Sequence, residues 1–355
     1  MCVELCRGLA DSECAHGPHA RPHPRPVSYD APMDEPTTAG TNRLTLMTVH
    51  AHPDDETIGT GGTMAKAVAE GHRVVLVTST RGEMGEIVVP EMDTPENHRR
   101  LGELRAAELE TAMHALGVTE WENLGYRDSD MMGRPGNADP RTFWQADLDE
   151  AIGRLVWLVR RYRPQVITTY NDFGGYGHPD HIRTHLVAVG AFERAGDATW
   201  YPKQLSADLG GDGPPIADGG LEPWTPLKLY EQAWPRSRRE AMSAAAESLG
   251  LKTPWSRPTD PAEIEQYEAF MRRSTVDDSA ITTTVDVMPY LDRRFAALRA
   301  HRTQIPETSP FYAMQSLPPE ALRSITGTET YTLRESRVPT SMPETDVFAG
   351  LEPDE

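Results

Sequence analysis

The sequence contains little cysteine, no long apolar segment and a deficit of basic residues. Its three cysteines all lie within the first 14 of 355 residues, so they cannot form a disulfide framework, and a reducing, cytoplasmic location is expected. No apolar run approaches the ~20 residues needed to span a bilayer. Lys and Arg number 35 against 54 Asp and Glu, a net charge of −19. Proteins that bind nucleic acid or anionic membranes usually present a basic face, so we expect neither partner.

The first 42 residues differ in composition from the rest of the chain. They are rich in Pro, His, Asp and Thr and show almost no apolar periodicity, which predicts a disordered tail over residues 1–42. A metal site in this tail is the alternative, although the spacing of its candidate ligands matches no compact zinc pattern. These candidates are Cys2, Cys6, Cys14, His16, His19 and His23.

Short apolar runs alternate with helical segments in the following core, residues 43–200. Buried strands are predicted at 44–49, 73–78, 121–124 and 165–170, and helices at 61–70, 96–116 and 147–162. Continuous apolar strands that alternate with helices are typical of a parallel sheet covered on both faces. We therefore predict an α/β fold with a doubly wound, Rossmann-like, mostly parallel sheet.

The C-terminal part, residues 201–355, is predicted to complete this fold and form the substrate side of a cleft. It contains a Gly/Pro/Asp-rich loop at 205–223 and a surface tail from 339 onward. Strands are expected at 227–233 and 281–287, and helices at 236–249, 261–273 and 289–302.

The loop after the first strand carries an unusual density of ionisable residues. It reads His50-Ala51-His52-Pro53-Asp54-Asp55-Glu56. Open α/β sheets bind ligands outside the carboxyl ends of their strands, which is where this loop lies. His52 and Asp55 are three residues apart across a bend that contains proline, so both side chains could converge on one ion. Imidazole and carboxylate are suitable zinc ligands.

A second cluster follows the strand at 165–170. It reads Tyr170-Asn171-Asp172-Phe173-Gly174-Gly175-Tyr176-Gly177-His178-Pro179-Asp180-His181. Two such clusters at two strand ends can face each other and supply three ligands with an open fourth position, the arrangement of catalytic zinc. The remaining groups could act as base, acid and oxyanion donor. The alternatives are polar loop residues without a metal, or a zinc site without catalysis.

These two motifs together resemble those of the LmbE/PIG-L-like zinc N-deacetylase and amidase family, and the resemblance covers roughly residues 43–353. It implies that His52, Asp55 and His181 bind Zn2+ and that Asp54 is the general base. It also implies that Tyr176 donates to the oxyanion, and that His178 is a general acid or an oxyanion-stabilising cation oriented and charged by Asp180. A neighbouring carboxylate favours the imidazolium form of His178. Fe2+ could replace zinc in the cell, because N and O ligands tolerate several divalent ions.

The resemblance also implies substrate contacts at Glu86, Arg100 and Asp128, which match positions that bind the sugar–inositol part in mycothiol-pathway members. A carboxylate can accept hydrogen bonds from two hydroxyl groups, and an arginine can clamp a polyol. Each residue has a simpler interpretation. Glu86 could be a solvated loop acid, Arg100 a surface ion-pair partner and Asp128 a turn or cap residue.

The C-terminal part suggests which member of the family this chain resembles. Segments 281–285, 299–305, 336–339 and 343–350 resemble the mycothiol S-conjugate amidase. The main prediction is therefore a zinc-dependent hydrolase that cleaves the amide of an N-acyl glucosamine in such conjugates. Gly177 instead matches the N-acetylglucosaminyl-inositol deacetylase of mycothiol biosynthesis, and Asp130 departs from the usual glycine. That deacetylase, or one of secondary metabolism, is thus the alternative.

A non-catalytic metal- or sugar-binding protein is the alternative from another class, and it would bind zinc without turnover. A nucleotide-binding α/β protein would instead bind its ligand whether or not a chelator is present. The expected partner of the hydrolase is a small amide with a glucosaminyl-inositol part. Assembly into a homo-oligomer is left as an alternative to a monomer.

Overall fold

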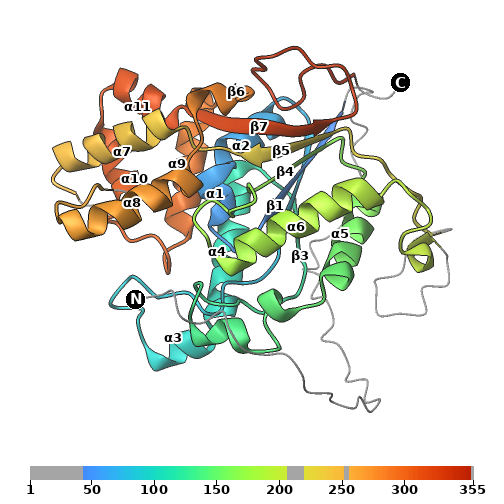
Figure 1. Cartoon of the computed structure of the whole chain (residues 1–355), viewed down its shortest axis with the longest axis horizontal. Helices are drawn as coiled ribbons and strands as arrows, with labels where there is room; N and C mark the ends of the chain where they lie inside the picture. The colour runs from blue at the N-terminus through green and yellow to red at the C-terminus, as the bar shows by residue number, and fades with distance from the viewer. Residues whose placement is uncertain (1–42, 206–219, 252–255, 353–355) are drawn as a thin grey trace.

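The computed structural model describes residues 43–205, 220–251 and 256–352, and one seven-stranded sheet crosses this part of the chain (Figure 1). The strand order is β3-β2-β1-β4-β5-β7-β6. The strands are β1 (Thr45–His50), β2 (Arg73–Thr78), β3 (Glu120–Asn123), β4 (Val166–Thr169), β5 (Lys228–Gln232), β6 (Thr283–Asp286) and β7 (Thr328–Ser336). Strands β1 to β5 pair in parallel, and β7 is antiparallel to both β5 and β6. The predicted mostly parallel α/β fold is confirmed.

Helices cover both faces of the sheet because successive apolar residues of each central strand point to opposite sides. Leu46 of β1 packs with helices α2, α4 and α9, whereas Met47 and Val49 pack with α5 and α6. The helices are α1 (Asp55–Gly59), α2 (Gly61–Ala69), α3 (Pro95–Arg99), α4 (Leu101–Leu116), α5 (Leu148–Tyr162), α6 (Pro179–Arg194), α7 (Arg236–Ser248), α8 (Pro261–Ser274), α9 (Leu291–Ala300), α10 (Pro310–Ala313) and α11 (Pro319–Thr326).

The single helix predicted at 96–116 is in fact two helices, α3 and α4, which meet at Arg100. Thr94 caps α3 by accepting the N–H of Asn97, and the short Pro-Glu-Asn-His-Arg segment buries no side chain. The buried face begins at Leu101. The two helices therefore meet at the point where the chain begins to place apolar side chains in the core.

The segment from residue 339 onward is not only a surface tail, as the sequence suggested. Val347 and Phe348 are buried, and the carboxylate of Glu344 bonds Lys228 (2.5 Å) and Tyr230 (2.7 Å) in the interior.

Strand β7 and helix α6 were not predicted. In β7 the inward residues include a glutamate, Glu329, whose carboxylate accepts the N–H groups of Gly62 and Thr63 at the start of α2. Because this inward position carries a charged residue, the sequence does not show the apolar alternation that predicts a strand.

Two predictions fall on segments that the structure does not describe. They concern the tail at 1–42, with its cysteines and histidines, and most of the loop at 205–223. In the described part of the chain, no helix combines the length and the apolar character that crossing a membrane requires.

Candidate active site

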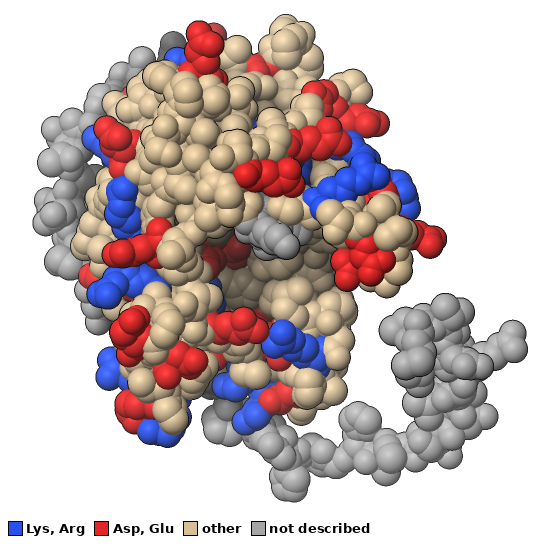
Figure 2. Space-filling model, turned by 90° about the vertical axis from the view of Figure 1, so that its left-hand side faces the viewer, with Lys and Arg blue, Asp and Glu red and all other residues tan. Residues whose placement is uncertain are grey.

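The two predicted clusters meet because β1 and β4 are adjacent parallel strands. Thr48 pairs with Thr168, so both strands end at the same edge of the sheet. The loop 51–54 and helix α1 follow β1, and the loop 170–178 and helix α6 follow β4. Figure 2 shows the side of the molecule that lies at the left in Figure 1. The surface is hollowed there, and acidic side chains lie inside the hollow (Figure 2).

His52, Asp55 and His181 form a triangle of potential ligand atoms. The Nδ1 atom of His52, the Nε2 atom of His181 and the Oδ2 atom of Asp55 lie 3.3 Å from one another in each pair. Tetrahedral zinc with bonds of about 2.0–2.1 Å separates its ligand atoms by about 3.3 Å. The residues therefore fit a zinc ion in both donor type and spacing.

The outer hydrogen bonds of both histidines turn their lone pairs toward this triangle. Nδ1 of His181 lies 3.1 Å from the carbonyl oxygen of Gly174, and Nε2 of His52 lies 3.2 Å from Oδ2 of Asp180. These nitrogens carry the ring protons, because a carbonyl or carboxylate oxygen can only accept. Such outer partners are typical of metal-bound histidines. Gly174 is needed here, because a Cβ atom at this position would lie 2.5 Å from Cβ of His181.

The Asp180 carboxylate makes no hydrogen bond to His178 within the described residues, which differs from the orienting role expected from the sequence. The carboxylate accepts hydrogen bonds from His52 and from the backbone N–H (3.0 Å) and hydroxyl of Ser129. Only the backbone N–H of Asp180 reaches His178, where it donates to Nδ1 (3.1 Å). The remaining ring proton of His178 therefore lies on Nε2.

His178 is also not biased toward the imidazolium form. Burial, followed by the nearby His52 and His181, lowers the pKa of His178. One ring nitrogen of each of these three histidines lies within 4.8 Å of the other two, so His178 borders the site. Its Nδ1 is already occupied and its Nε2 bears a proton, which makes it a neutral hydrogen-bond donor rather than a fourth ligand.

A second group with metal-binding chemistry, formed by His52, Asp128 and Asp180, shares His52 with the triangle. Its carboxylates are already engaged. Both oxygens of Asp128 accept backbone N–H groups, from Met84 (3.1 Å) and Asp130 (2.8 Å). We therefore assign this group to the surroundings of the candidate metal site rather than to a second ion.

Asp54 lies at the N-terminus of α1 in a backbone conformation that non-glycine residues rarely adopt, with φ at 106°. Its Oδ2 atom lies 3.3 Å from the Arg105 guanidinium group. Burial raises the pKa of Asp54 to about 7, and Asp55 also raises it, whereas Arg105 lowers it. A carboxylate with a pKa near neutrality can take a proton from water. The sequence analysis missed Arg105, because nothing local separates it from a solvated helix arginine.

Two tyrosines from the second cluster contact His181. The hydroxyl of Tyr176 lies 3.4 Å from Nε2 of His181, and Tyr176 is 42% exposed, so it stands at the mouth of the site. Tyr170, which was not predicted as a site residue, stacks on His181 with 4.3 Å between ring centroids. Its hydroxyl accepts the N–H of Ala51 (2.9 Å), which ties the two loops together.

Of the three predicted substrate contacts, the structure places only Asp128 beside the ligand triangle. Asp128 is buried, and its Oδ1 lies 3.9 Å from Nε2 of His52. Its bonds to backbone N–H groups also agree with the simpler interpretation as a turn residue. Glu86 and Arg100 lie on the surface. The Glu86 carboxylate is 3.5 Å from the Arg134 guanidinium group. Arg100 lies where α3 meets α4.

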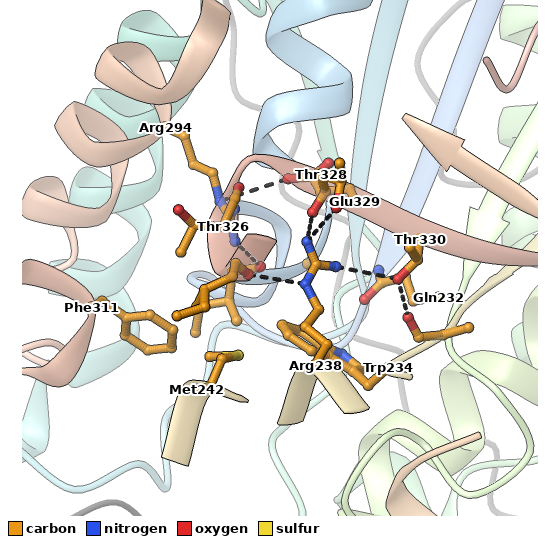
Figure 3. Close-up of a pocket in the computed structure, with 14 residues that line it drawn as sticks. Gln232, Trp234, Arg238, Met242, Arg294, Phe311, Thr326, Thr328, Glu329 and Thr330 are labelled. Atoms are coloured by element: carbon orange, nitrogen blue, oxygen red, sulfur yellow. Dashed lines mark hydrogen bonds and ion pairs between the residues drawn. The ribbon is translucent and has the colours of Figure 1, made fainter. Parts of the chain in front are cut away.

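A separate small cavity is lined by residues of α1, α7, α11 and β7, among others (Figure 3). Its volume is about 20 Å³, which holds roughly one water molecule and no sugar. The guanidinium groups of Arg238 and Arg294 on its wall donate to backbone carbonyls, those of Ile325 and Thr328 and those of Thr57 and Ile58. This cavity is therefore structural, and the candidate site remains the one at the sheet edge.

Comparison with known proteins shows which family the chain is similar to. The family model described as PIG-L, GlcNAc-PI de-N-acetylase, matches residues 47–192. The 1D-myo-inositol 2-acetamido-2-deoxy-alpha-D-glucopyranoside deacetylase of Geodermatophilus obscurus is 43% identical over 314 residues, which cover 86% of this chain and 97% of that protein. The protein of the same name from Streptomyces avermitilis is 42% identical over 315 residues, 87% of this chain and 97% of that protein.

A solved structure supports the fold. The N,N'-diacetylchitobiose deacetylase of Pyrococcus horikoshii is similar with a TM-score of 0.53 at 19% identity, covering 81% of this chain and 83% of that chain. At this level of identity, the likeness concerns the arrangement of the sheet and helices alone.

Proposed function

Because the chain belongs to the PIG-L family of de-N-acetylases, we propose that it is a zinc-dependent amidohydrolase that removes acetate from N-acetylglucosaminyl-inositol. The observation that carries this proposal is the triangle of His52, Asp55 and His181 with Asp54 beside it. The relatives at 42–43% identity bear the name of the deacetylase, which the sequence analysis kept as its alternative. They do not bear the name of the S-conjugate amidase.

In this proposal, His52, Asp55 and His181 would hold the zinc ion, which would lower the pKa of the attacking water. Asp54 accepts a proton as the water oxygen bonds to the amide carbon. The Nε2–H group of His178 and the hydroxyl of Tyr176 donate to the carbonyl oxygen as it gains negative charge, and each such donor is worth about 3 kcal/mol. The C–N bond then breaks, the proton passes from Asp54 to the leaving amine, and acetate and a glucosamine are released.

Recognition of the sugar and inositol is assigned by this proposal to Asp128, Glu86 and Arg100. Asp128 lies nearest to the ligand triangle, 3.9 Å from His52. Its carboxylate oxygens have lone pairs beyond those used by the backbone N–H groups, so it can still accept from a sugar hydroxyl. Glu86 and Arg100 would have to meet the substrate from the surface.

The S-conjugate amidase is the second candidate, and it rests on the amidase-like segment 299–305. Gln304, in the amidase-like segment 299–305, donates to the backbone oxygen of Glu86 (3.0 Å). This segment therefore borders the loop proposed to bind substrate.

Release of primary amine from two substrates in parallel tests the proposal. Zinc-reconstituted protein is given N-acetylglucosaminyl-inositol or a mycothiol S-conjugate, and a chelator-treated sample is the control. Faster release from the acetylated sugar supports the deacetylase, and faster release from the conjugate would replace it by the amidase. Asp54→Asn should keep bound zinc and lose most of the rate. Zinc binding without turnover of either compound would instead indicate a non-catalytic binding protein.

A further inference from the structure

The main chain of Asp54 is held in its unusual conformation by contacts on three sides. Its carbonyl oxygen accepts the N–H groups of Thr57 and Ile58, both at 3.1 Å. Its side chain pairs with Arg105. Its own N–H donates to Oε2 of Glu56 at 2.8 Å. A backbone in a rarely populated region persists only when its surroundings hold it, so these contacts decide where the Asp54 carboxylate lies.

Glu56 can hold Asp54 only if its carboxylate is itself fixed. The residue is completely buried, and its other oxygen, Oε1, lies 2.8 Å from Nε2 of His301. His301 is also completely buried, and it is 245 positions away in the sequence. The carboxylate thus bridges the Asp54 N–H on one side and the His301 ring on the other, and its Oε1 also accepts the Thr57 hydroxyl (2.5 Å).

His301 directly follows α9, which also holds the far end of α1. Arg294 of α9 donates to the carbonyl oxygens of Thr57 (3.0 Å) and Ile58 (2.5 Å), and Figure 3 shows Arg294 on the wall of the small cavity there. Helix α9 and the residue that follows it therefore contact both ends of α1, the short helix that begins beside Asp54. The catalytic role of the C-terminal part would then be to fix this helix, in addition to any contact with substrate.

We propose that His301 is a positioning residue for the hydrolysis: through the Glu56 carboxylate it holds the main chain of Asp54 so that the Asp54 side chain faces the reacting water. This inference rests on the proposed function, in which Asp54 is the base. His301 itself does not touch the ligand triangle through any contact in the described residues. Its substitution should therefore lower kcat while leaving KM and zinc content unchanged.

A double-mutant cycle between His301 and Asp54 tests this role. His301→Leu removes the hydrogen-bond donor, and because small displacements of a catalytic group cost up to about 100-fold, we expect kcat to fall about 10–100-fold. His301→Gln keeps a donor and should recover most of the rate. In the Asp54→Asn background, His301→Leu should change the residual rate less than about twofold, because residues that act as a unit are not additive. The same loss in both backgrounds would overturn the proposal.

A matched control separates positioning from general destabilisation. Lys228 and Glu344 form an equally buried pair at the opposite, amino end of the strands. Glu344→Gln should lower stability without lowering kcat at a temperature where the variant is folded. A fall in kcat equal to that of His301→Leu would show that the loss reflects weakened structure rather than placement of Asp54.

Hydrogen exchange of residues 52–58 gives a result that does not depend on turnover. His301→Leu should speed exchange of this segment, and His301→Gln should leave it close to wild type. Unchanged exchange in His301→Leu would refute the positioning contact even if the wild-type protein hydrolyses neither test substrate. In that case the proposed function would fail separately, on the amine-release assay alone.

Discussion

Replacing Asp180 distinguishes the role that the sequence suggested, at His178, from the role that its contacts suggest, at His52. The Asp180 carboxylate accepts from Nε2 of His52 at 3.2 Å and from the Ser129 N–H at 3.0 Å, both through Oδ2. Asp180→Ala removes this acceptor, so the His52 ring loses the contact that keeps its proton away from the ligand triangle. Loss of an outer partner of a metal-binding histidine typically weakens metal affinity 10–100-fold, or about 1.4–2.8 kcal/mol.

Asp180→Asn should have a smaller effect, below about tenfold, for a reason visible in the contacts. The amide oxygen can occupy the position that faces His52, and the amide NH2 group can donate to the Ser129 hydroxyl, which can accept. Zinc dissociation constants are measured by competition with a chromophoric chelator, with circular dichroism as a check on folding. Wild-type zinc affinity in Asp180→Ala, together with reduced kcat, would refute this reasoning. It would instead support the role expected from the sequence, in which Asp180 orients His178.

Three further predictions follow from named contacts. Tyr176→Phe should lower kcat about 10–1000-fold with little change in zinc content, because an oxyanion donor acts mainly in the transition state; steady-state kinetics with wild-type kcat would remove Tyr176 from the mechanism. Arg105→Gln should keep zinc but reduce turnover, because the Asp54 carboxylate loses its 3.3 Å ion pair, and full activity in the amine-release assay would contradict this. Glu344→Ala leaves the Lys228 ammonium buried without its carboxylate and should cost about 3–5 kcal/mol in urea denaturation, whereas an unchanged midpoint would show that the pair contributes nothing.

Much of the fold was predictable because its signals are local. The apolar runs of β1, β2 and β4 are buried on both faces and carry no competing pattern, so their ends were predicted within one residue. Strand β7 was missed because Glu329, a buried charge, stands where an apolar residue would mark the inward face. The break at Arg100 was missed because helix propensity continues through it, and only the position of the core decides where the chain turns.

The candidate metal ligands were proposed from two motifs and from the family resemblance that they carry. His52 and Asp55 are neighbours in one loop, His181 lies in the loop after an adjacent parallel strand, and strand order of this kind brings such loops together. The family resemblance could therefore be stated from two short motifs. The comparisons confirm the family and favour the deacetylase that the sequence analysis held second.

Only the tertiary structure decided how these residues are supported. The partner of Asp180, the charge of His178, the pairing of Arg105 with Asp54 and the bridge from His301 to Glu56 all depend on contacts between distant segments. A hydrogen bond requires its two atoms within about 3 Å, and burial depends on every neighbouring element, so neither can be deduced from spacing along the chain. The candidate ligands come from two loops, whereas their orientation and protonation depend on the whole packed molecule.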